Sequence, residues 1–406
     1  MPGTAHTPRG DQRLIVTAKP LKSLIVEGWR FLPHSYSVVH QWQVLSLSRM
    51  GSIALKIRDM PLYHPGWRTN PGLFEETDEE TLRSLESAAA GEYADATFRI
   101  FYPFDFSPSR CGKTAVFGTS ENQIIQRIQL SDEGIYQQLR RKSPPRDVTV
   151  VTPSRWSAEG FYKCGFTTEQ VVVVPHGVDP ATFHAATDHL VRARIRAKLP
   201  VASDAFVFLS VGAMTGNKGI DVLLRAFAEV CGQRPEARLV LKGTDSLYNS
   251  KGFLRAQMDE LTTAEQYRVR DRLIYFGGSF PHRIMAMLYQ AADVYVSPYR
   301  AEGFNVPVLE AAASGLPVIC TRGGATEDFV TDEFARKIDS TRVAVNVEDQ
   351  DGVRLEPNIE DLSALMSSAM EDHSWRSRAA AAGPVHVRAH YTWDLVVQTL
   401  VHALLE

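Results

Sequence analysis

Two glutamates in the second half of the chain, Glu302 and Glu310, are the residues whose type and spacing point most clearly to chemistry. Glu302 falls in a glycine-containing loop after an apolar strand pattern at residues 293–298, and Glu310 falls on the helix predicted next. Backbone N–H groups of such a loop and of a helix N-terminus bind anions. Two carboxylates beside an anion site suit a ligand with phosphate at one end and hydroxyl groups at the other. The combination indicates a nucleotide sugar.

A glycine-rich turn lies earlier in the chain, within residues 206–219, where a strand pattern gives way to a helix pattern. Glycines at 212, 216 and 219 loosen this turn, and Lys218 stands at the mouth of the helix. The spacing matches neither the Walker A motif nor the dinucleotide fingerprint. A tight turn alone would explain the glycines. However, a lysine at the positive end of a helix dipole needs a counter-charge, which a bound diphosphate would supply.

The elements that must position these residues belong to a chain long enough for two domains, since 406 residues exceed one ordinary core. A net charge of −3 gives no reason to expect nucleic acid or a membrane surface as the main partner. The four cysteines have no CxxC spacing, which indicates reduced thiols rather than a disulfide frame or a zinc site. No apolar signal segment or bilayer-length stretch is present in the sequence, so we expect a cytoplasmic protein.

Strand and helix patterns alternate twice along the chain. In the first half, the strand patterns fall at residues 23–27, 53–58, 96–102, 114–117, 148–152 and 171–174. In the second half, they fall at residues 206–211, 238–242, 273–276, 293–297 and 317–320. This alternation predicts an α/β fold of two doubly wound, Rossmann-like domains facing each other across a cleft, with ligands at the carboxyl ends of the strands. Between the halves, a cationic run at residues 192–198 indicates either a solvated helix face or an anionic-ligand site.

Taken together, these segments resemble the C-terminal domain of the family 4 retaining glycosyltransferases of the GT-B fold (glycosyl transferases group 1). The motifs that carry the resemblance are Gly212 with Lys218-Gly219, Glu302 with Glu310, Gly315-Leu316-Pro317-Val318, and Gly323-Gly324. Further matches are Val174-Pro175-His176-Gly177-Val178-Asp179, Ala291-Ala292-Asp293 and Tyr391-Thr392-Trp393. The resemblance covers roughly residues 150–406 and is much fainter before them.

The resemblance implies a division of the chain and a role for each motif residue. Residues 1–20 are expected to be disordered, 21–185 to bind the acceptor, 186–385 to bind the nucleotide-sugar donor, and 386–406 to form a helix that packs back toward the first domain. Glu302 would contact the hydroxyls of the donor sugar, Lys218 the diphosphate and Glu310 the ribose. The other donor-binding residues would be Gly212, Gly303, Phe304, Asn305, Val306 and Arg300. The alternative for both glutamates is a capping or surface role.

Departures from the family pattern lie on both sides of the expected cleft. Ala213 stands where the family usually has an arginine, for which Arg300 or Arg322 could substitute. Asn305 replaces a common glycine, yet asparagine tolerates left-handed backbone. Many members carry a histidine where this chain has Gly118, followed by Thr119.

The loop after the first strand supplies most of the acceptor or cleft candidates. These candidates are Trp29, Arg30, His34, Ser35, Asp105 and Thr119. His34 could carry a proton, and the alternative is a packed aromatic loop with a structural histidine. The basic stretch at residues 140–146 indicates a solvated loop rather than a lipid or nucleic-acid contact.

The expected activity is transfer of a sugar from a nucleoside-diphosphate donor to an acceptor hydroxyl with retention of configuration. In a same-face mechanism, fixed N–H dipoles and one cation stabilise the departing phosphate, so we expect no metal and no cofactor. The acceptor would be a small molecule, a glycan or a lipid-linked compound. The alternatives are a GT-B phosphorylase or sugar synthase, and a degenerate nucleotide-sugar-binding subunit. The base, the sugar, the acceptor and the oligomeric state do not follow from the sequence.

Overall fold

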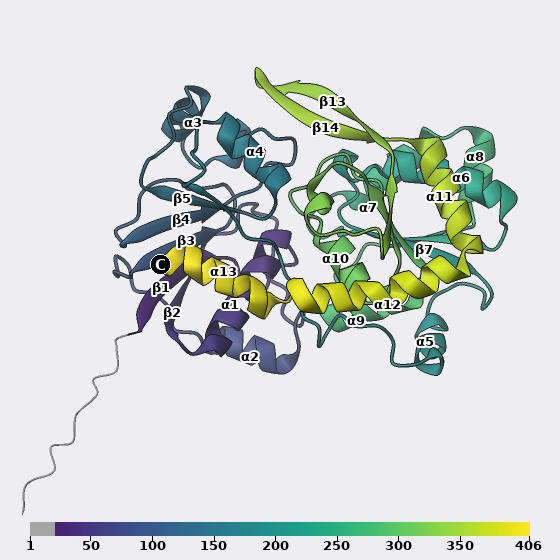
Figure 1. Ribbon diagram of the computed structural model, residues 1–406, viewed down its shortest axis with the longest axis horizontal. Coiled ribbons are helices and arrows are strands. Elements are labelled where there is room, and N and C mark those ends of the chain that lie inside the picture. The colour runs from purple at the N-terminus through teal and green to yellow at the C-terminus, as the bar shows by residue number, and fades with distance from the viewer. Residues whose placement is uncertain (1–20) are drawn as a thin grey trace, which may run out of the picture.

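The computed structural model describes residues 21–406, and the predicted disorder of residues 1–20 lies outside the described residues. The chain forms two lobes, one on the left and one on the right of Figure 1, each built around a six-stranded sheet. The strand orders are β2-β1-β3-β4-β5-β6 and β12-β11-β10-β7-β8-β9, and all of these neighbours pair in parallel. Two parallel sheets with crossover helices confirm the predicted pair of doubly wound domains.

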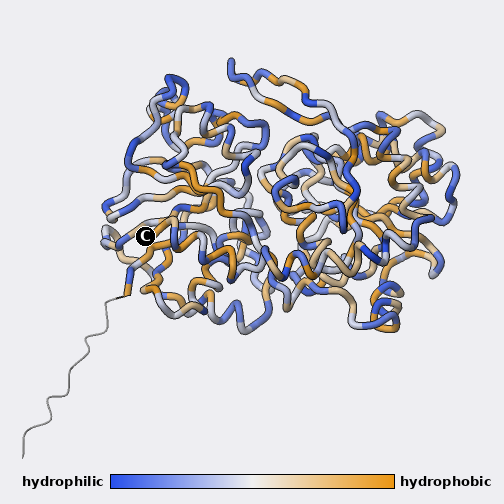
Figure 2. The backbone as a smooth tube through the Cα atoms, in the orientation of Figure 1, coloured by the Kyte–Doolittle hydropathy of each residue, from blue (hydrophilic) through white to orange (hydrophobic). Residues whose placement is uncertain are grey.

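The first domain contains the elements up to residue 173. They are β1 (Lys22–Gly28), α1 (Ser35–Met50), β2 (Ile53–Asp59), α2 (Glu76–Ser84), β3 (Ala96–Ile100), β4 (Lys113–Phe117), the 3₁₀ turn η1 (Arg127–Gln129), α3 (Glu133–Arg140), β5 (Val148–Thr152), α4 (Arg155–Lys163) and β6 (Val171–Val173). The central strands are buried on both faces because helices cover the sheet on each side, so they consist mainly of apolar or β-branched residues, with Arg99 as a buried exception in β3. Apolar residues accordingly concentrate on these strands in Figure 2.

The second domain repeats the alternation and adds a hairpin. Its elements are α5 (His189–Arg196), β7 (Phe206–Val211), η2 (Gly216–Lys218), α6 (Ile220–Gln233), β8 (Ala237–Lys242), α7 (Ser250–Asp259), α8 (Thr263–Arg270), β9 (Leu273–Phe276), α9 (His282–Ala291), β10 (Val294–Ser297), α10 (Val306–Ala313), β11 (Val318–Thr321), η3 (Ala325–Asp328), β12 (Ala335–Ile338), β13 (Ser340–Val347), β14 (Gln350–Pro357) and α11 (Ile359–Glu371). In α5, Arg192 and Arg196 form ion pairs with Asp293 at 2.7 and 3.1 Å. Arg196, whose side chain is 12% exposed, therefore anchors α5 to the residue before β10, whereas the Arg192 side chain is 44% exposed and still faces solvent in part.

Two consecutive helices, α12 (His373–His390) and α13 (Trp393–Leu405), carry the chain back from the second domain to the first. Helix α13 packs against α1 and β3, and its Trp393, Val397 and Leu400 join the hydrophobic core that contains Leu24 and Val26 of β1. The crossing helices therefore hold the two lobes together on one side of the molecule.

The antiparallel hairpin β13–β14 connects the lobes on the other side and reaches toward α3 and α4 in Figure 1. Its two-residue turn, Glu348 and Asp349, has φ values of 54° and 55°, as a tight hairpin turn requires. Val353 donates its N–H to the Asn122 carbonyl at 2.9 Å, and the Arg127 N–H donates to the Glu348 carboxylate at 2.7 Å. The hairpin thus lies directly on the loop that follows β4.

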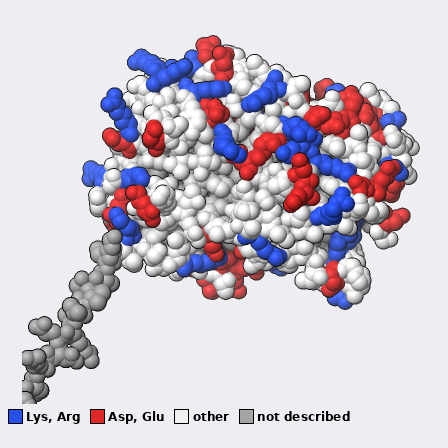
Figure 3. Space-filling model, in the orientation of Figure 1, with Lys and Arg blue, Asp and Glu red and all other residues white. Residues whose placement is uncertain are grey.

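Charged residues of both signs intermingle over the face shown in Figure 3, in keeping with the small net charge. None of the helices within residues 21–406 combines the length and apolar character needed to cross a membrane.

Candidate active site

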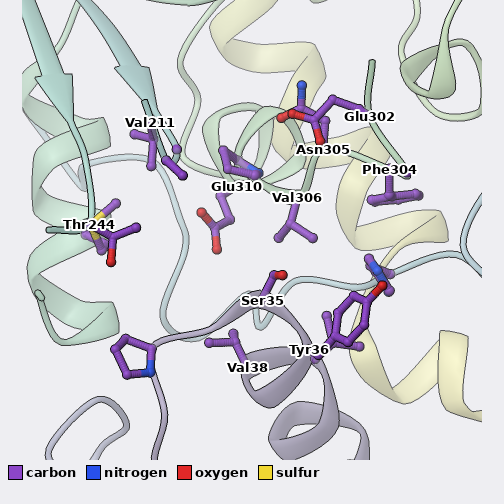
Figure 4. A pocket seen from close by; sticks show the side chains of 18 of the residues that line it. Ser35, Tyr36, Val38, Val211, Thr244, Glu302, Phe304, Asn305, Val306 and Glu310 are labelled. Atoms are coloured by element: carbon purple, nitrogen blue, oxygen red, sulfur yellow. The ribbon is translucent and has the colours of Figure 1, made fainter. Parts of the chain in front are cut away.

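A cavity of about 630 Å³ lies between the two domains, at the carboxyl ends of strands from both sheets. This size is within the range of about 300–1,000 Å³ that is typical of small-molecule sites. We call it the donor pocket. Its lining includes Ser35, Tyr36 and Thr119 from the first domain, and Gly212, Lys218, Glu302 and Glu310 from the second. Figure 4 shows the Glu310 carboxylate directed into this space, opposite Ser35 and Val38 of α1.

The loop between β10 and α10 supplies Glu302 and Asn305. Asn305 has φ 80° and ψ 61°, which confirms that this position uses left-handed backbone, and its side-chain amide donates to the Ser297 hydroxyl at 3.0 Å. The Ser154 hydroxyl of the first domain donates to the Gly303 carbonyl at 2.6 Å. A Cβ added at Gly303 would lie 2.8 Å from the Thr119 side chain. This loop is therefore pressed directly against the first domain.

Helix α10 begins at Val306, immediately after Asn305, and has a proline in its first turn. The first N–H groups of an α-helix have no intrahelical acceptor, and proline is tolerated there because it lacks one. Phe304, Asn305 and Val306 line the donor pocket. The start of α10 thus presents the fixed positive end of a helix dipole to a ligand in this pocket.

Lys218 lies in η2, at the end of the glycine-rich turn. Gly212 has φ 150°, and a Cβ there would come within 3.0 Å of the Lys218 side chain. The ammonium group of Lys218 is hydrogen-bonded to the Glu302 carboxylate. The sequence suggested that Lys218 would lack a counter-charge without a bound anion. In the folded chain, Glu302 provides that counter-charge from a position 84 residues away.

Glu310 projects from α10 and accepts a hydrogen bond from the Tyr289 hydroxyl at 2.7 Å. Burial raises the pKa of the Glu310 carboxyl to about 7. Lys242, at the end of β8, also lines the donor pocket, and burial lowers the pKa of its ammonium to about 8. Lys242 was not among the candidates predicted from the sequence, although its place at the carboxyl end of a predicted strand was a signal for it.

Glu121 is a second residue of the pocket that was not predicted from the sequence. It lies in the loop after β4 and lines the donor pocket. Its carboxylate accepts a hydrogen bond from the Asn217 amide of the second domain. The Trp156 indole donates to the Glu121 carbonyl at 2.7 Å. Burial raises the pKa of the Glu121 carboxyl, and the negative charge of Glu302 raises it further. The signal in the sequence was an acidic residue three positions after Gly118, where the family has its histidine.

Of the candidates in the first loop, Ser35 lines the donor pocket and His34 caps α1. The Nδ1 atom of His34 accepts the Tyr36 N–H at 3.2 Å, so its proton resides on Nε2, which lies 3.3 Å from the Tyr248 hydroxyl. Burial lowers the pKa of His34 to about 4. A neutral histidine held at both nitrogens is suited to structure rather than to proton transfer. Thr119 lines the donor pocket and lies 2.8 Å from the Tyr36 hydroxyl.

The other first-domain candidates do not line the donor pocket. The Trp29 ring is buried and its indole donates to the Pro61 carbonyl at 2.9 Å. Arg30 forms an ion pair with Asp59, and Asp105 lies 3.3 Å from Arg99. These side chains hold the loops that surround the cleft.

The two arginines considered as substitutes for the family arginine also lie outside the lining of the pocket. Arg300 binds Asp221 and Glu356, each at 2.6 Å, and Arg322 lies 3.2 Å from Asp339. Both guanidinium groups are thus neutralised by carboxylates within the second domain. Lys242, rather than either arginine, is the second cation that faces the donor pocket.

The second domain is the part of the chain that matches a known protein family. Residues 191–385 match the sequence model of the family described as "Glycosyl transferases group 1". The chain is 27% identical over 238 residues to a GDP-mannose-dependent monoacylated alpha-(1-6)-phosphatidylinositol monomannoside mannosyltransferase of Corynebacterium glutamicum, covering 57% of this chain and 55% of that protein. It is 34% identical over 171 residues to a D-inositol 3-phosphate glycosyltransferase of Kineococcus radiotolerans, covering 42% and 38%. The matched region is thus about half or less of these relatives.

A solved structure resembles the whole described fold. The sucrose-phosphate synthase of Thermosynechococcus elongatus aligns with a TM-score of 0.65 at 16% identity, over 94% of this chain and 98% of that one. At this identity the likeness establishes the architecture of two facing Rossmann-like domains.

Proposed function

We propose that this chain, whose residues 191–385 match the group 1 glycosyltransferase family and whose fold is GT-B, moves a sugar from a nucleoside-diphosphate donor to an acceptor hydroxyl. We further propose that the configuration at the anomeric carbon is retained and that no metal ion takes part. The single observation that carries this proposal is the convergence of Lys218, Glu302 and the start of α10 in one pocket between the domains.

The charge arrangement suits departure of a nucleoside diphosphate. When the bond from the anomeric carbon to the β-phosphate oxygen breaks, negative charge develops on that phosphate. The Lys218 ammonium and the N–H groups at the start of α10 are fixed before the reaction, so they stabilise this charge without reorganisation. Lys218 would exchange Glu302 for the diphosphate, which frees the Glu302 carboxylate to accept hydrogen bonds from sugar hydroxyls.

The remaining steps need no side-chain nucleophile. The acceptor oxygen forms its bond to the anomeric carbon on the face that the phosphate leaves, and its proton passes to the departing phosphate oxygen. The contact between the Gly303 loop and the first domain closes the site, and closure excludes water that would otherwise hydrolyse the donor.

The test begins with the donor. Thermal-shift screening against uridine, guanosine and adenosine diphosphates and their sugars identifies the base, because a ligand that binds only the native state raises the unfolding midpoint. Release of diphosphate from that donor is then compared in the wild type, in Glu302→Gln and in Glu371→Gln, which removes an exposed carboxylate on α11.

We expect Glu302→Gln to lower turnover by about 100-fold or more, the scale of loss when one preorganised polar group that stabilises a transition state is removed. Glu371→Gln should retain wild-type turnover. Unchanged turnover in Glu302→Gln would overturn the assignment of this site. Addition of EDTA should leave the rate unchanged, and NMR of the product should show the donor's anomeric configuration.

A further inference from the structure

A second cavity, of about 410 Å³, opens beside the donor pocket. The two cavities share Ser35, Tyr36, Thr119, Glu121, Asn217 and Tyr248 in their walls, so they lie directly side by side. A molecule in the second cavity would therefore have one end at the place where the donor sugar is expected. We call this second cavity the aromatic pocket.

Aromatic rings form much of the wall of the aromatic pocket. Tyr63, Trp67 and Tyr102 come from the loops after β2 and β3, and Tyr36 and Tyr248 lie where the two cavities meet. The rings of Tyr63 and Tyr102 pack at right angles with their centroids 4.9 Å apart, and Tyr63 is 42% exposed. The faces of aromatic rings carry partial negative charge, so these rings can contact the C–H groups of a bound ring favourably.

The polar groups of the aromatic pocket are almost all uncharged. Asn122, Gln126 and Gln129 line it. The Gln129 amide already donates to the Thr119 carbonyl at 3.1 Å and accepts the Gln126 N–H at 2.9 Å, and the Gln126 side chain accepts the Gln129 N–H. The Asn122 amide and the Gln126 NH2 group are thus the groups best placed to bind hydroxyl groups. Glu121 is the one acidic residue among the described lining residues, and no lysine or arginine lines the cavity there. His34, which also lines it, is neutral because burial depresses its pKa. An anionic ligand in the aromatic pocket would therefore lie beside the Glu121 carboxyl with no lysine or arginine in the pocket wall to pair with it.

The donor pocket has the opposite character, since Lys218, Lys242 and the start of α10 face it. The phosphate groups of the reaction therefore belong in the donor pocket. The aromatic pocket suits a ligand that combines apolar ring faces with many hydroxyl groups and no negative charge. A sugar ring has this combination.

We propose that the aromatic pocket binds the acceptor and that the acceptor presents an uncharged saccharide unit to it. This inference rests on the proposed glycosyl transfer. The attacking hydroxyl enters at the junction of the cavities, where the Glu121 carboxyl can accept its hydrogen bond. Sugars with phosphate or carboxylate groups on the bound ring are discriminated against by the lack of a cation.

The test measures diphosphate release from the donor identified by thermal shift. The acceptor panel contains neutral mono- and disaccharides, the 6-phosphates of the same sugars, and uronic acids. Neutral sugars should stimulate release at least tenfold more than their charged counterparts. Free sugars and alkyl glycosides in the panel distinguish a free saccharide acceptor from the terminal unit of a glycoconjugate.

Variants of the wall provide the second measurement. Tyr63→Ala removes an exposed ring that does not line the donor pocket, so it should raise the acceptor KM at least tenfold without changing the Kd for the diphosphate. Tyr267→Ala removes a tyrosine of α8 that is 73% exposed, and should change neither constant. Asn122→Lys adds a cation to the wall and should shift the preference toward the 6-phosphates.

Three results would overturn the inference. They are better stimulation by phosphorylated or uronic sugars, an unchanged acceptor KM in Tyr63→Ala, and a wild type that binds the diphosphate but responds to no neutral saccharide. A wild type that binds no nucleoside diphosphate would instead overturn the proposed function. The donor and acceptor assignments therefore fail by different measurements.

Discussion

Replacement of Lys218 by alanine should weaken nucleoside-diphosphate binding strongly. The Lys218 side chain is 22% exposed and that of its partner Glu302 is 9% exposed, so their interaction is only partly screened by water. A hydrogen bond to a charged group contributes about 1.5–3 kcal/mol, which corresponds to about a 10- to 150-fold change in Kd. The loss should fall toward the upper end, because the variant also removes the cation that offsets the repulsion of the diphosphate by Glu302 and Glu121.

Isothermal titration calorimetry measures this loss with three ligands: the nucleoside, the monophosphate and the diphosphate of the base that binds. The ratio of variant to wild-type Kd should be close to one for the nucleoside and largest for the diphosphate. Lys251→Ala, which removes an exposed lysine of α7, is the matched control and should bind all three like the wild type. Equal diphosphate affinity in Lys218→Ala and the wild type would refute the role of Lys218. A uniform loss across all three ligands would show general damage to the pocket instead.

Three further predictions concern the pocket and its surroundings. Burial raises the folded-state pKa of Glu310 from 4.5 to about 7, so the stability that its protonated form contributes is present below pH 4.5 and is lost as the pH rises toward 7. Urea unfolding should therefore show the wild type losing stability relative to Glu310→Gln between pH 5 and 7.5, and a constant difference would contradict this. Asn305→Val should cost about 1–2 kcal/mol of unfolding free energy at φ 80°, whereas Asn305→Gly should cost less, as urea titrations would show. Gly303→Ala should lower kcat by crowding Thr119 while the diphosphate Kd stays unchanged, and Thr119→Ala in the same chain should restore part of the rate.

The alternating fold and the placement of Glu302 and Glu310 could be predicted because their signals are local. Buried parallel strands consist of apolar runs, so β7 was found at residues 206–211 and β10 within one residue of its start. The positions of Glu302 in a loop and of Glu310 on a helix follow from the order of strand, loop and helix in the sequence. Their positions in one pocket needed no knowledge of distant contacts, because both lie on a single β10–α10 unit.

Helix α12 shows where local signals mislead. Gly383 and Pro384 lie in the middle of its 18 residues, and both disfavour a helix interior. The structure retains the helix because α12 packs closely on α10, where a Cβ at Gly383 would lie 2.7 Å from the Ala312 carbonyl. Tertiary packing thus overrides propensity here. The hairpin β13–β14 was missed for a different reason, because its short Glu-Asp turn lacks the glycine or asparagine that usually marks such turns.

The acceptor side of the cleft depends on contacts between residues that are far apart in sequence. Glu121 is bound by Asn217, 96 residues away, and Asn122 accepts the N–H of Val353 in β14. The loop that carries Glu121 belongs to the first domain, yet segments of the second domain hold it from two sides. Separation of the lobes would break both contacts together, and the junction between the donor and aromatic pockets would lose its shape. We therefore infer that closure of the domains would build the proposed acceptor end of the site as well as exclude water from the proposed donor end, since neither domain alone contains all of its walls.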